Sequence, residues 1–305
     1  MRITFWGVRG SIPCPGPATV RYGGNTACLE LHLPEIDRRI IIDAGSGIRE
    51  LGNHMLSRHG SGGIRAEIFL THTHWDHIMG FPFFAPIYLP GSQLTIHGPV
   101  TFEEEPLKEV LSGQWTYRYF PVRHEDLSAN VRYVHLKESE YDLGQGLHLR
   151  TKFLNHPLLC LGYRFEFNGK VFCTAYDTEP YVNLFACDPD DPDYDPVMEA
   201  RGEQVVAEET LRLEQFVQDA DLLVFDTQYT RQEYQADRVG WGHFPIEQAI
   251  DIARRNRVKQ LALFHHDPQR TDDQLDAFTE RYCRPDPGAP DTTVFFAKEG
   301  MVVEV

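Results

Sequence analysis

The sequence has few cysteines and lacks any apolar run long enough to cross a membrane. Its six cysteines include no CxxC pair and are too sparse in 305 residues for a disulfide scaffold, so we expect buried free thiols. The longest apolar runs, such as residues 40–42 and 222–225, have the length of strands. Residues 1–7 read as a first strand and not as a signal peptide. These features predict a cytoplasmic protein.

The chain also has fewer basic than acidic side chains, 29 against 45, and it lacks internal boundaries. Its formal net charge of −16 argues against a broad face for long nucleic acid, because binding to a polyanion depends on lysine and arginine. A small anionic substrate is compatible with this charge. No Gly/Ser linker, repeat or low-complexity tract divides the chain. We therefore predict a single domain over residues 1–305, with an acidic loop insertion near residues 186–203.

The spacing of apolar residues predicts a mixed α/β fold. Antiparallel-looking strand candidates come early, helices become more frequent toward the end, and Asn168-Gly169 predicts a hairpin turn. This pattern favours two sheets packed face to face, each covered by helices on its outer side, which is a four-layer αββα sandwich. The expected helices are 48–58, 103–111, 205–218, 246–256 and 272–282.

The segment THTHWDH, residues 71–77, places three imidazoles and one carboxylate directly after an apolar strand candidate. Neutral imidazole and carboxylate suit zinc, iron or manganese. Alternate side chains of an extended segment point the same way, so His72, His74 and Asp76 would face one side, and His77 would turn back. The ordinary alternative to metal binding is that these histidines are solvated or form hydrogen bonds in the core. The spacing favours a site for two metal ions.

Such a site needs further ligands, and strand ends are the places where a rigid scaffold presents them. His156, Asp177 and His265 each follow a strand candidate within two residues. His266 is the alternative to His265 as the last of these ligands. We prefer His265 because it stands first after its strand.

Together these residues resemble the metallo-β-lactamase fold superfamily, in which HxHxDH is followed by a histidine, a bridging aspartate and a histidine. The resemblance implies the αββα sandwich, with the site at one edge of the two sheets. The implied ligands are His72, His74 and His156 for one divalent ion, and Asp76, His77 and His265 for the other, with Asp177 bridging both. Zinc is the expected metal, with manganese or iron as alternatives.

Water between two such ions loses its proton near neutral pH, so the expected nucleophile is a hydroxide that bridges the metals. Asp76 would orient this hydroxide or take its proton. Asp43 and Asp226 are expected to support the site through hydrogen bonds. Arg9 could meet a phosphate, although a loop arginine is more often solvated.

The segment GHFPIEQAIDIA, residues 242–253, distinguishes between branches of the superfamily. It is similar to a segment of the ribonuclease Z and cyclic nucleotide phosphodiesterase branch, and loops 5–13, 22–26 and 41–48 resemble the same branch. His243 stands just before a helix candidate, where it could donate to a phosphate oxygen or protonate a leaving alkoxide. A histidine that only caps or packs is the alternative.

Ribonuclease Z itself usually carries a long arm that grips tRNA, between the third-motif histidine and the bridging aspartate. Only 21 positions separate His156 from Asp177, which is enough for one hairpin. This departure and the acidic composition count against tRNA processing.

The sequence therefore predicts a dinuclear metal-dependent hydrolase, namely a phosphodiesterase for a small phosphodiester such as a cyclic nucleotide, with Asp76 and His243 as catalytic residues. The alternatives are a carboxylic ester, lactone or thioester hydrolase on the same site, a tRNA 3′-end endonuclease, and a non-catalytic nucleotide-binding sensor. The expected partner is a small phosphodiester or nucleotide, with no membrane and no long nucleic acid. The apolar segment 81–88 could serve a homodimer interface or the core.

Overall fold

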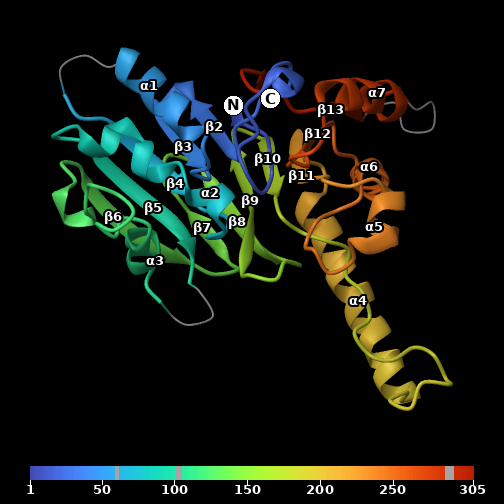
Figure 1. The fold of residues 1–305 in the computed structure, drawn as a ribbon. Coiled ribbons are helices and arrows are strands. Elements are labelled where there is room, and N and C mark those ends of the chain that lie inside the picture. The colour runs from blue at the N-terminus through green and yellow to red at the C-terminus, as the bar shows by residue number, and fades with distance from the viewer. Residues whose placement is uncertain (59–61, 101–104, 286–291) are drawn as a thin grey trace.

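Two seven-stranded sheets pack face to face in the computed structural model, which describes residues 1–58, 62–100, 105–285 and 292–305 (Figure 1). The first sheet has the order β14 (Val302–Glu304), β1 (Arg2–Gly7), β2 (Cys28–Leu33), β3 (Arg38–Ile42), β4 (Arg65–Phe69), β5 (Gln93–Pro99) and β6 (Asn130–Leu136). The second has the order β13 (Thr293–Phe296), β12 (Gln260–Phe264), β11 (Leu222–Asp226), β10 (Lys170–Ala175), β9 (Cys160–Phe167), β8 (His148–Leu154) and β7 (Glu140–Asp142).

Both sheets are mixed in direction. Strands β3 to β6 are parallel neighbours in the first sheet, and β10 to β13 are parallel neighbours in the second. The remaining pairs are antiparallel. The predicted hairpin joins β9 to β10, and its turn residues Asn168 and Gly169 have positive φ values of 50° and 72°, as this type of turn requires.

The helices cover the outer faces of the sheets, which confirms the predicted layered α/β class (Figure 1). They are α1 (Ile48–Arg58), α2 (Trp75–Ile78), α3 (Leu107–Gly113), α4 (Pro196–Val217), α5 (Arg231–Asp237), α6 (Ile246–Arg255) and α7 (Asp272–Tyr282). Helices α1, α6 and α7 lie where the sequence predicts them. Helix α3 starts later than residue 103, and residues 103–104 of that prediction lie outside the described residues.

Three clusters of buried side chains hold these layers together. One lies between the sheets and includes Phe5, Phe69 and Phe264, all fully buried. The other two join each sheet to its helices. Helix α6 shows how: Ala249, Ile252 and other apolar residues at intervals of three or four face the second sheet. Full burial of one isoleucine stabilises the fold by roughly 1.5–3 kcal/mol.

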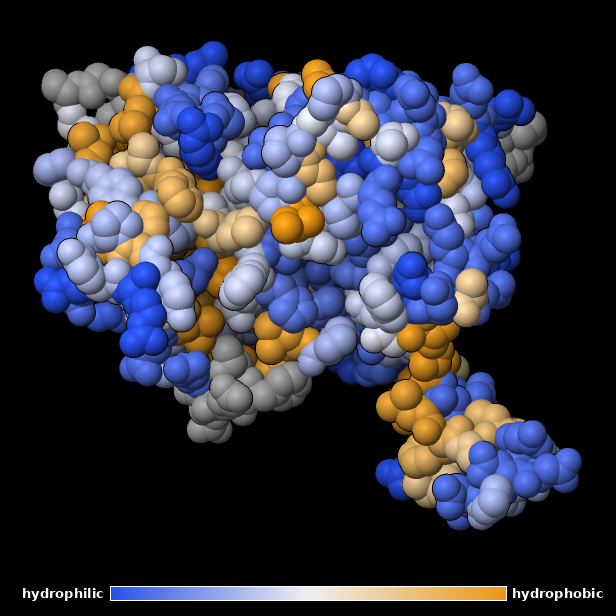
Figure 2. All heavy atoms as spheres, in the orientation of Figure 1, coloured by the Kyte–Doolittle hydropathy of each residue, from blue (hydrophilic) through white to orange (hydrophobic). Residues whose placement is uncertain are grey.

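Helix α4 begins at Pro196, nine residues before the predicted start, and forms an arm that leaves the body of the molecule (Figure 1). Asp195 explains the early start, because its carboxylate accepts hydrogen bonds from the amides of Val197 and Met198, and Pro196 suits a first helical turn. The acidic loop therefore ends at Asp195, and residues 196–203 are helical. Figure 2 shows exposed apolar atoms along the arm. Leu184, in the segment before α4, is among the exposed apolar residues.

The apolar segment 81–88 belongs to the core. Phe81, Phe84 and Ile87 are buried in the cluster between the first sheet and its helices, and Pro82 and Pro86 confine the segment to short 3-10 turns. Phe83 is its exposed member. Within the described ranges, no helix combines the length and the apolar character that a membrane crossing requires.

Candidate metal centre

Most residues considered for metal binding follow strands that are parallel neighbours in their sheet, and His156 follows β8, which pairs antiparallel with β9. In the first sheet, Asp43 follows β3 and the segment 71–77 follows β4. In the second sheet, Asp177, Asp226 and His265 stand at the ends of β10, β11 and β12. Carboxyl ends of parallel strands lie at one edge of a sheet. Face-to-face packing brings these two edges together.

Three of these strand-end residues have left-handed backbone conformations. Asp43 has φ 60°, Asp177 has φ 33° and His265 has φ 62°. For residues other than glycine this costs about 1–3 kcal/mol each, and such strain persists where the surrounding structure holds it in place, often at functional sites. All three side chains contact other residues of the site: Asp43 and Asp177 lie beside His77, and His265 lies beside Asp177.

The first group of converging side chains comprises His72, His74, His156 and Asp177, with one potential ligand atom of each within 4.8 Å of the others. Nδ1 of His74 lies 3.0 Å from Nε2 of His72 and 3.1 Å from Nε2 of His156. A neutral imidazole carries a single N–H, so three ring nitrogens that face one point cannot all satisfy one another. A cation at that point would receive all three lone pairs.

The second group comprises Asp76, His77, His265 and Asp177. Nε2 of His77 and Nε2 of His265 each lie 3.2 Å from Oδ1 of Asp177, and they lie 3.3 Å from each other. Oδ2 of Asp76 is 3.2 Å from Nε2 of His265. Oδ2 of Asp177 lies near the first group, 3.6 Å from Nε2 of His72. Asp177 thus has one oxygen toward each group, as a bridging ligand requires.

The charges of the second group fit a divalent cation. Burial disfavours a charged His265, but the carboxylates of Asp177 and Asp76 outweigh it and raise the pKa of His265 to about 9. Burial likewise opposes ionisation of Asp76, yet His77 and His265 hold the pKa of Asp76 well below its usual range. In the protein alone, protonated imidazoles thus compensate the buried carboxylates. A metal ion would replace these protons.

Burial dominates in the first group. Burial lowers the pKa of His72 well below its usual value and that of His156 to about 4. Both imidazoles are therefore neutral at physiological pH, which is the state that binds metals. The donor types, their convergence and their protonation states all fit two divalent ions.

Hydrogen bonds from the outer ring nitrogens orient the histidines. Nδ1 of His77 donates to Oδ2 of Asp43 at 2.7 Å, which confirms the expected support from Asp43. Nδ1 of His156 donates to the carbonyl of Gly242 at 3.1 Å. Because these outer nitrogens are engaged, Nε2 is the atom that His77 and His156 turn toward the cluster.

His243 lies beside the second group and is held by Asp226. Its Nδ1 is 2.8 Å from Oδ2 of Asp226, and its ring stacks on that of His265 with centroids 4.9 Å apart. Burial raises the pKa of Asp226, although the nearby His243 opposes this effect. The structure therefore brings His243 to the same centre, although His243 lies 66 residues after Asp177 in the chain.

Two other residues considered from the sequence have structural roles. The side chain of Arg9 is fully buried, and its guanidinium donates to the carbonyls of Gly23 at 2.8 Å and Arg270 at 2.6 Å, so Arg9 does not face a substrate. Nε2 of His266 donates to the carbonyl of Ala297 at 2.8 Å, away from the clustered atoms. Its neighbour His265 is the one that joins the cluster.

Sequence reasoning missed two supporting contacts. The amide of Ser11 donates to Oδ2 of Asp76 at 2.7 Å, and Ser11 has φ 64°. A carboxylate oxygen of Glu179 accepts from the amides of Gly240 and Gly242, at 3.0 and 3.1 Å. Both contacts join residues far apart in the chain through backbone amides, which no residue pattern identifies.

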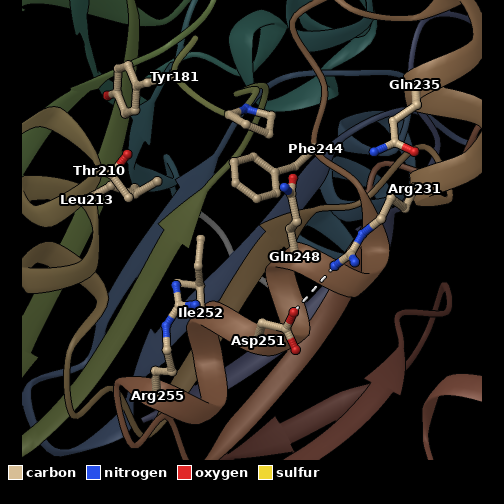
Figure 3. Close-up of a pocket in the computed structure, with 11 residues that line it drawn as sticks. Tyr181, Thr210, Leu213, Arg231, Gln235, Phe244, Gln248, Asp251, Ile252 and Arg255 are labelled. Atoms are coloured by element: carbon tan, nitrogen blue, oxygen red, sulfur yellow. Dashed lines mark hydrogen bonds and ion pairs between the residues drawn. The ribbon is translucent and has the colours of Figure 1, made fainter. Parts of the chain in front are cut away.

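A cavity of about 400 Å³ lies between α4, α5 and α6 (Figure 3). Apolar side chains such as Tyr181, Leu213 and Phe244 line it, together with Arg231 and Arg255. None of its lining residues belongs to the two converging groups. The candidate metal centre is therefore separate from this cavity, although the lining residue Phe244 follows His243 directly in the chain.

Among proteins of known sequence, the chain is similar to ribonucleases Z. It is 25% identical to that of Haloarcula marismortui over 292 residues, which cover 87% of this chain and 86% of the relative. It is 28% identical to that of Bradyrhizobium diazoefficiens over 270 residues, which cover 78% and 83%. No family model matches the chain.

Solved structures share the fold at lower identity. A metallo-β-lactamase fold protein from Bacillus subtilis aligns with a TM-score of 0.64 and 16% identity over 100% of this chain and 98% of its own. A diphosphatase of the PhnP family aligns at 0.62 and 15%, over 100% and 97%. The short form of human tRNase Z aligns at 0.61 and 18%, over 100% and 99%.

The chain thus has the metallo-β-lactamase fold of these structures and is similar in sequence to ribonucleases Z, which are metal-dependent hydrolases. Proteins of this fold bind divalent metals, and the zinc-bound PqqB of Methylobacterium extorquens aligns with a TM-score of 0.60 and 15% identity over 100% of both chains. The homologues correct one expectation in part. Their names denote enzymes that act on RNA, which conflicts with excluding long nucleic acid from composition alone.

Proposed function

We propose that this chain is a dinuclear metal-dependent phosphodiesterase that cleaves a small phosphodiester such as a cyclic nucleotide. Two divalent ions, zinc by preference, would supply a nucleophile from water at neutral pH and stabilise charge on the phosphoryl oxygens. The proposed ligands are His72, His74 and His156 for one ion, and Asp76, His77 and His265 for the other, with Asp177 bridging them.

Two side chains would act on protons in this reaction. Asp76 is ionised, and the hydrogen bond from Ser11 fixes its carboxylate, so Asp76 can orient the attacking water. His243 would protonate the leaving oxygen through Nε2, because its Nδ1 is bound to Asp226. The negative charge of Asp226 stabilises the protonated imidazole that this step needs.

The contact between His243 and Asp226 is the observation that carries the proposal. An alkoxide leaving from phosphorus is strongly basic and benefits from a proton donor, whereas a thiolate or an activated ester leaves more easily. The ring centroids of His243 and His265 are 4.9 Å apart, and the buried carboxylate of Asp226 binds Nδ1 of His243. This arrangement favours a phosphodiester over a thioester or an activated ester, whose leaving groups need no proton donor.

A tRNA 3′-end endonuclease is the second candidate, because the sequence relatives are ribonucleases Z. The segment between His156 and Asp177 holds only the hairpin of β9 and β10. The arm that this chain does have follows Asp177, and residues 186–217 contain ten acidic and two basic side chains. Such an arm repels phosphates, so the small diester is favoured.

A substrate panel separates these candidates. Protein loaded with Zn²⁺ or Mn²⁺ should hydrolyse bis(4-nitrophenyl) phosphate and a cyclic nucleotide, and His243→Ala should lower kcat by about 10²–10⁴ on the cyclic nucleotide. Cleavage of a tRNA precursor at its 3′ end, without turnover of cyclic nucleotides, would favour the endonuclease. Brisk hydrolysis of a lactone or thioester without turnover of any phosphodiester would overturn the proposal.

A further inference from the structure

The candidate metal centre is open to solvent on one side. His72, His77 and His265 are fully buried, whereas His74 is exposed and His156 is partly exposed. These two histidines are in contact, with 3.1 Å between Nδ1 of His74 and Nε2 of His156. A substrate must therefore enter past them.

Exposed apolar side chains flank this entrance. Trp75 is 76% exposed and directly follows His74 in the chain. Trp241 is 56% exposed and directly precedes Gly242, whose carbonyl accepts from His156. The chain has four tryptophans, and the other two pack into the protein: Trp115 is 2% exposed, and the indole of Trp6 donates to Glu30. Both strongly exposed indoles thus stand one residue from groups at the entrance.

The loop that carries Trp241 is held firmly. Glu179 binds the amides on both sides of the indole, at Gly240 and Gly242. Gly242 has φ +83°, and a Cβ there would lie 2.5 Å from Nδ1 of His156, so only glycine permits this approach. The guanidinium of Arg238 lies 4.5 Å from the centre of the Trp241 ring, which leaves the rest of the indole open. The backbone on both sides of Trp241 is therefore held in place, and that of Gly242 lies against His156.

We propose that Trp75 and Trp241 form a stacking rim that binds the planar base of the substrate, so that the substrate class is a nucleotide phosphodiester. This inference rests on the proposed function. Leaving two indoles in water is unfavourable unless a partner covers them, and aromatic side chains bind bases through their faces with little dependence on sequence.

The test compares Trp75→Ala, Trp241→Ala and the double variant with the parent enzyme on two substrates. One is adenosine 3′,5′-cyclic phosphate, and the other is the corresponding methyl riboside cyclic phosphate, which has no base. For the double variant we expect KM for the nucleotide to rise by about 5- to 100-fold, with kcat within about twofold and the base-free substrate unaffected. Trp241→Phe should restore most of the loss caused by Trp241→Ala. Leu184→Ala, which truncates an 89% exposed side chain on the arm, is the matched control and should change nothing.

An unchanged nucleotide KM in the double variant would overturn the inference, as would an equal rise for the base-free substrate. Neither result would contradict the proposed phosphodiesterase activity. If the parent enzyme cleaves no diester, the proposed function fails, and calorimetric binding of adenosine monophosphate and ribose 5-phosphate then tests the rim by itself. A 5- to 100-fold weaker Kd for the nucleotide alone in the double variant would support the rim, and equal Kd values would refute it.

Discussion

Replacing Asp226 with asparagine should impair cleavage more strongly when the leaving group is more basic. Asp226 is fully buried, and its Oδ2 lies 2.8 Å from Nδ1 of His243. Asparagine has nearly the same shape, so the fold should tolerate the change. It removes the negative charge that stabilises a protonated His243, and an amide nitrogen facing the ring would favour the wrong tautomer.

The size of the effect follows from the role of a general acid, which typically contributes about 10²–10⁴ in rate, or about 3–5 kcal/mol. Asp226→Asn should cause this loss in kcat for a cyclic nucleotide, whose leaving oxygen is a ribose alkoxide. For bis(4-nitrophenyl) phosphate, the nitrophenolate leaves without a proton, and kcat should fall by less than about tenfold. The double variant with His243→Ala should be no worse than His243→Ala alone, because both changes remove one function.

The assay measures kcat on both substrates and metal content by mass spectrometry. Asp43→Asn is the matched control, since Asp43 holds His77 at 2.7 Å in the same kind of buried pair, but on the metal side. It should lower metal content and impair both substrates alike. Equal losses on both substrates for Asp226→Asn, with full metal content, would refute the assignment of His243 as a proton donor.

The metal centre leads to three more predictions. His265→Ala should lose one bound ion, whereas His266→Ala should keep both, as measured by metal analysis; the reverse would exchange their roles. Gly10→Ala should reduce metal content without unfolding the protein, because a Cβ there would lie 2.4 Å from the ring of His265, and normal occupancy would contradict this. In metal-free protein, the raised pKa of His265, about 9, means that its contribution to stability is complete below about pH 6.5 and is lost as the pH rises through 9. Between pH 6.5 and 9, Tm of the metal-free parent protein should therefore fall by more than Tm of the metal-free His265→Ala variant. The metal affinity of the parent protein should rise over the same range. Parallel pH profiles of Tm for the two proteins would contradict the prediction.

Local patterns in the sequence predicted much of the fold. The helices 48–58 and 272–282 have the predicted bounds, since their apolar residues recur at helical intervals and both lie against a sheet. Helix α5 was not predicted, although the capping box of Thr230 and Glu233 at its start was a usable signal. The early start of α4 escaped prediction because an exposed arm has no apolar face that marks its first turns.

The sequence by itself determined which residues can form a metal site, because imidazole and carboxylate at strand ends are few and their chemistry is specific. Only the tertiary structure decided how they meet. It gave Asp177 one oxygen toward each group and bound His243 to Asp226. It also buried Arg9 and exposed Trp75 and Trp241 beside His74 and His156. The physical reason is that residue type specifies what an atom can bind, whereas distance and burial depend on the packing of two sheets, whose contacts join residues more than two hundred positions apart.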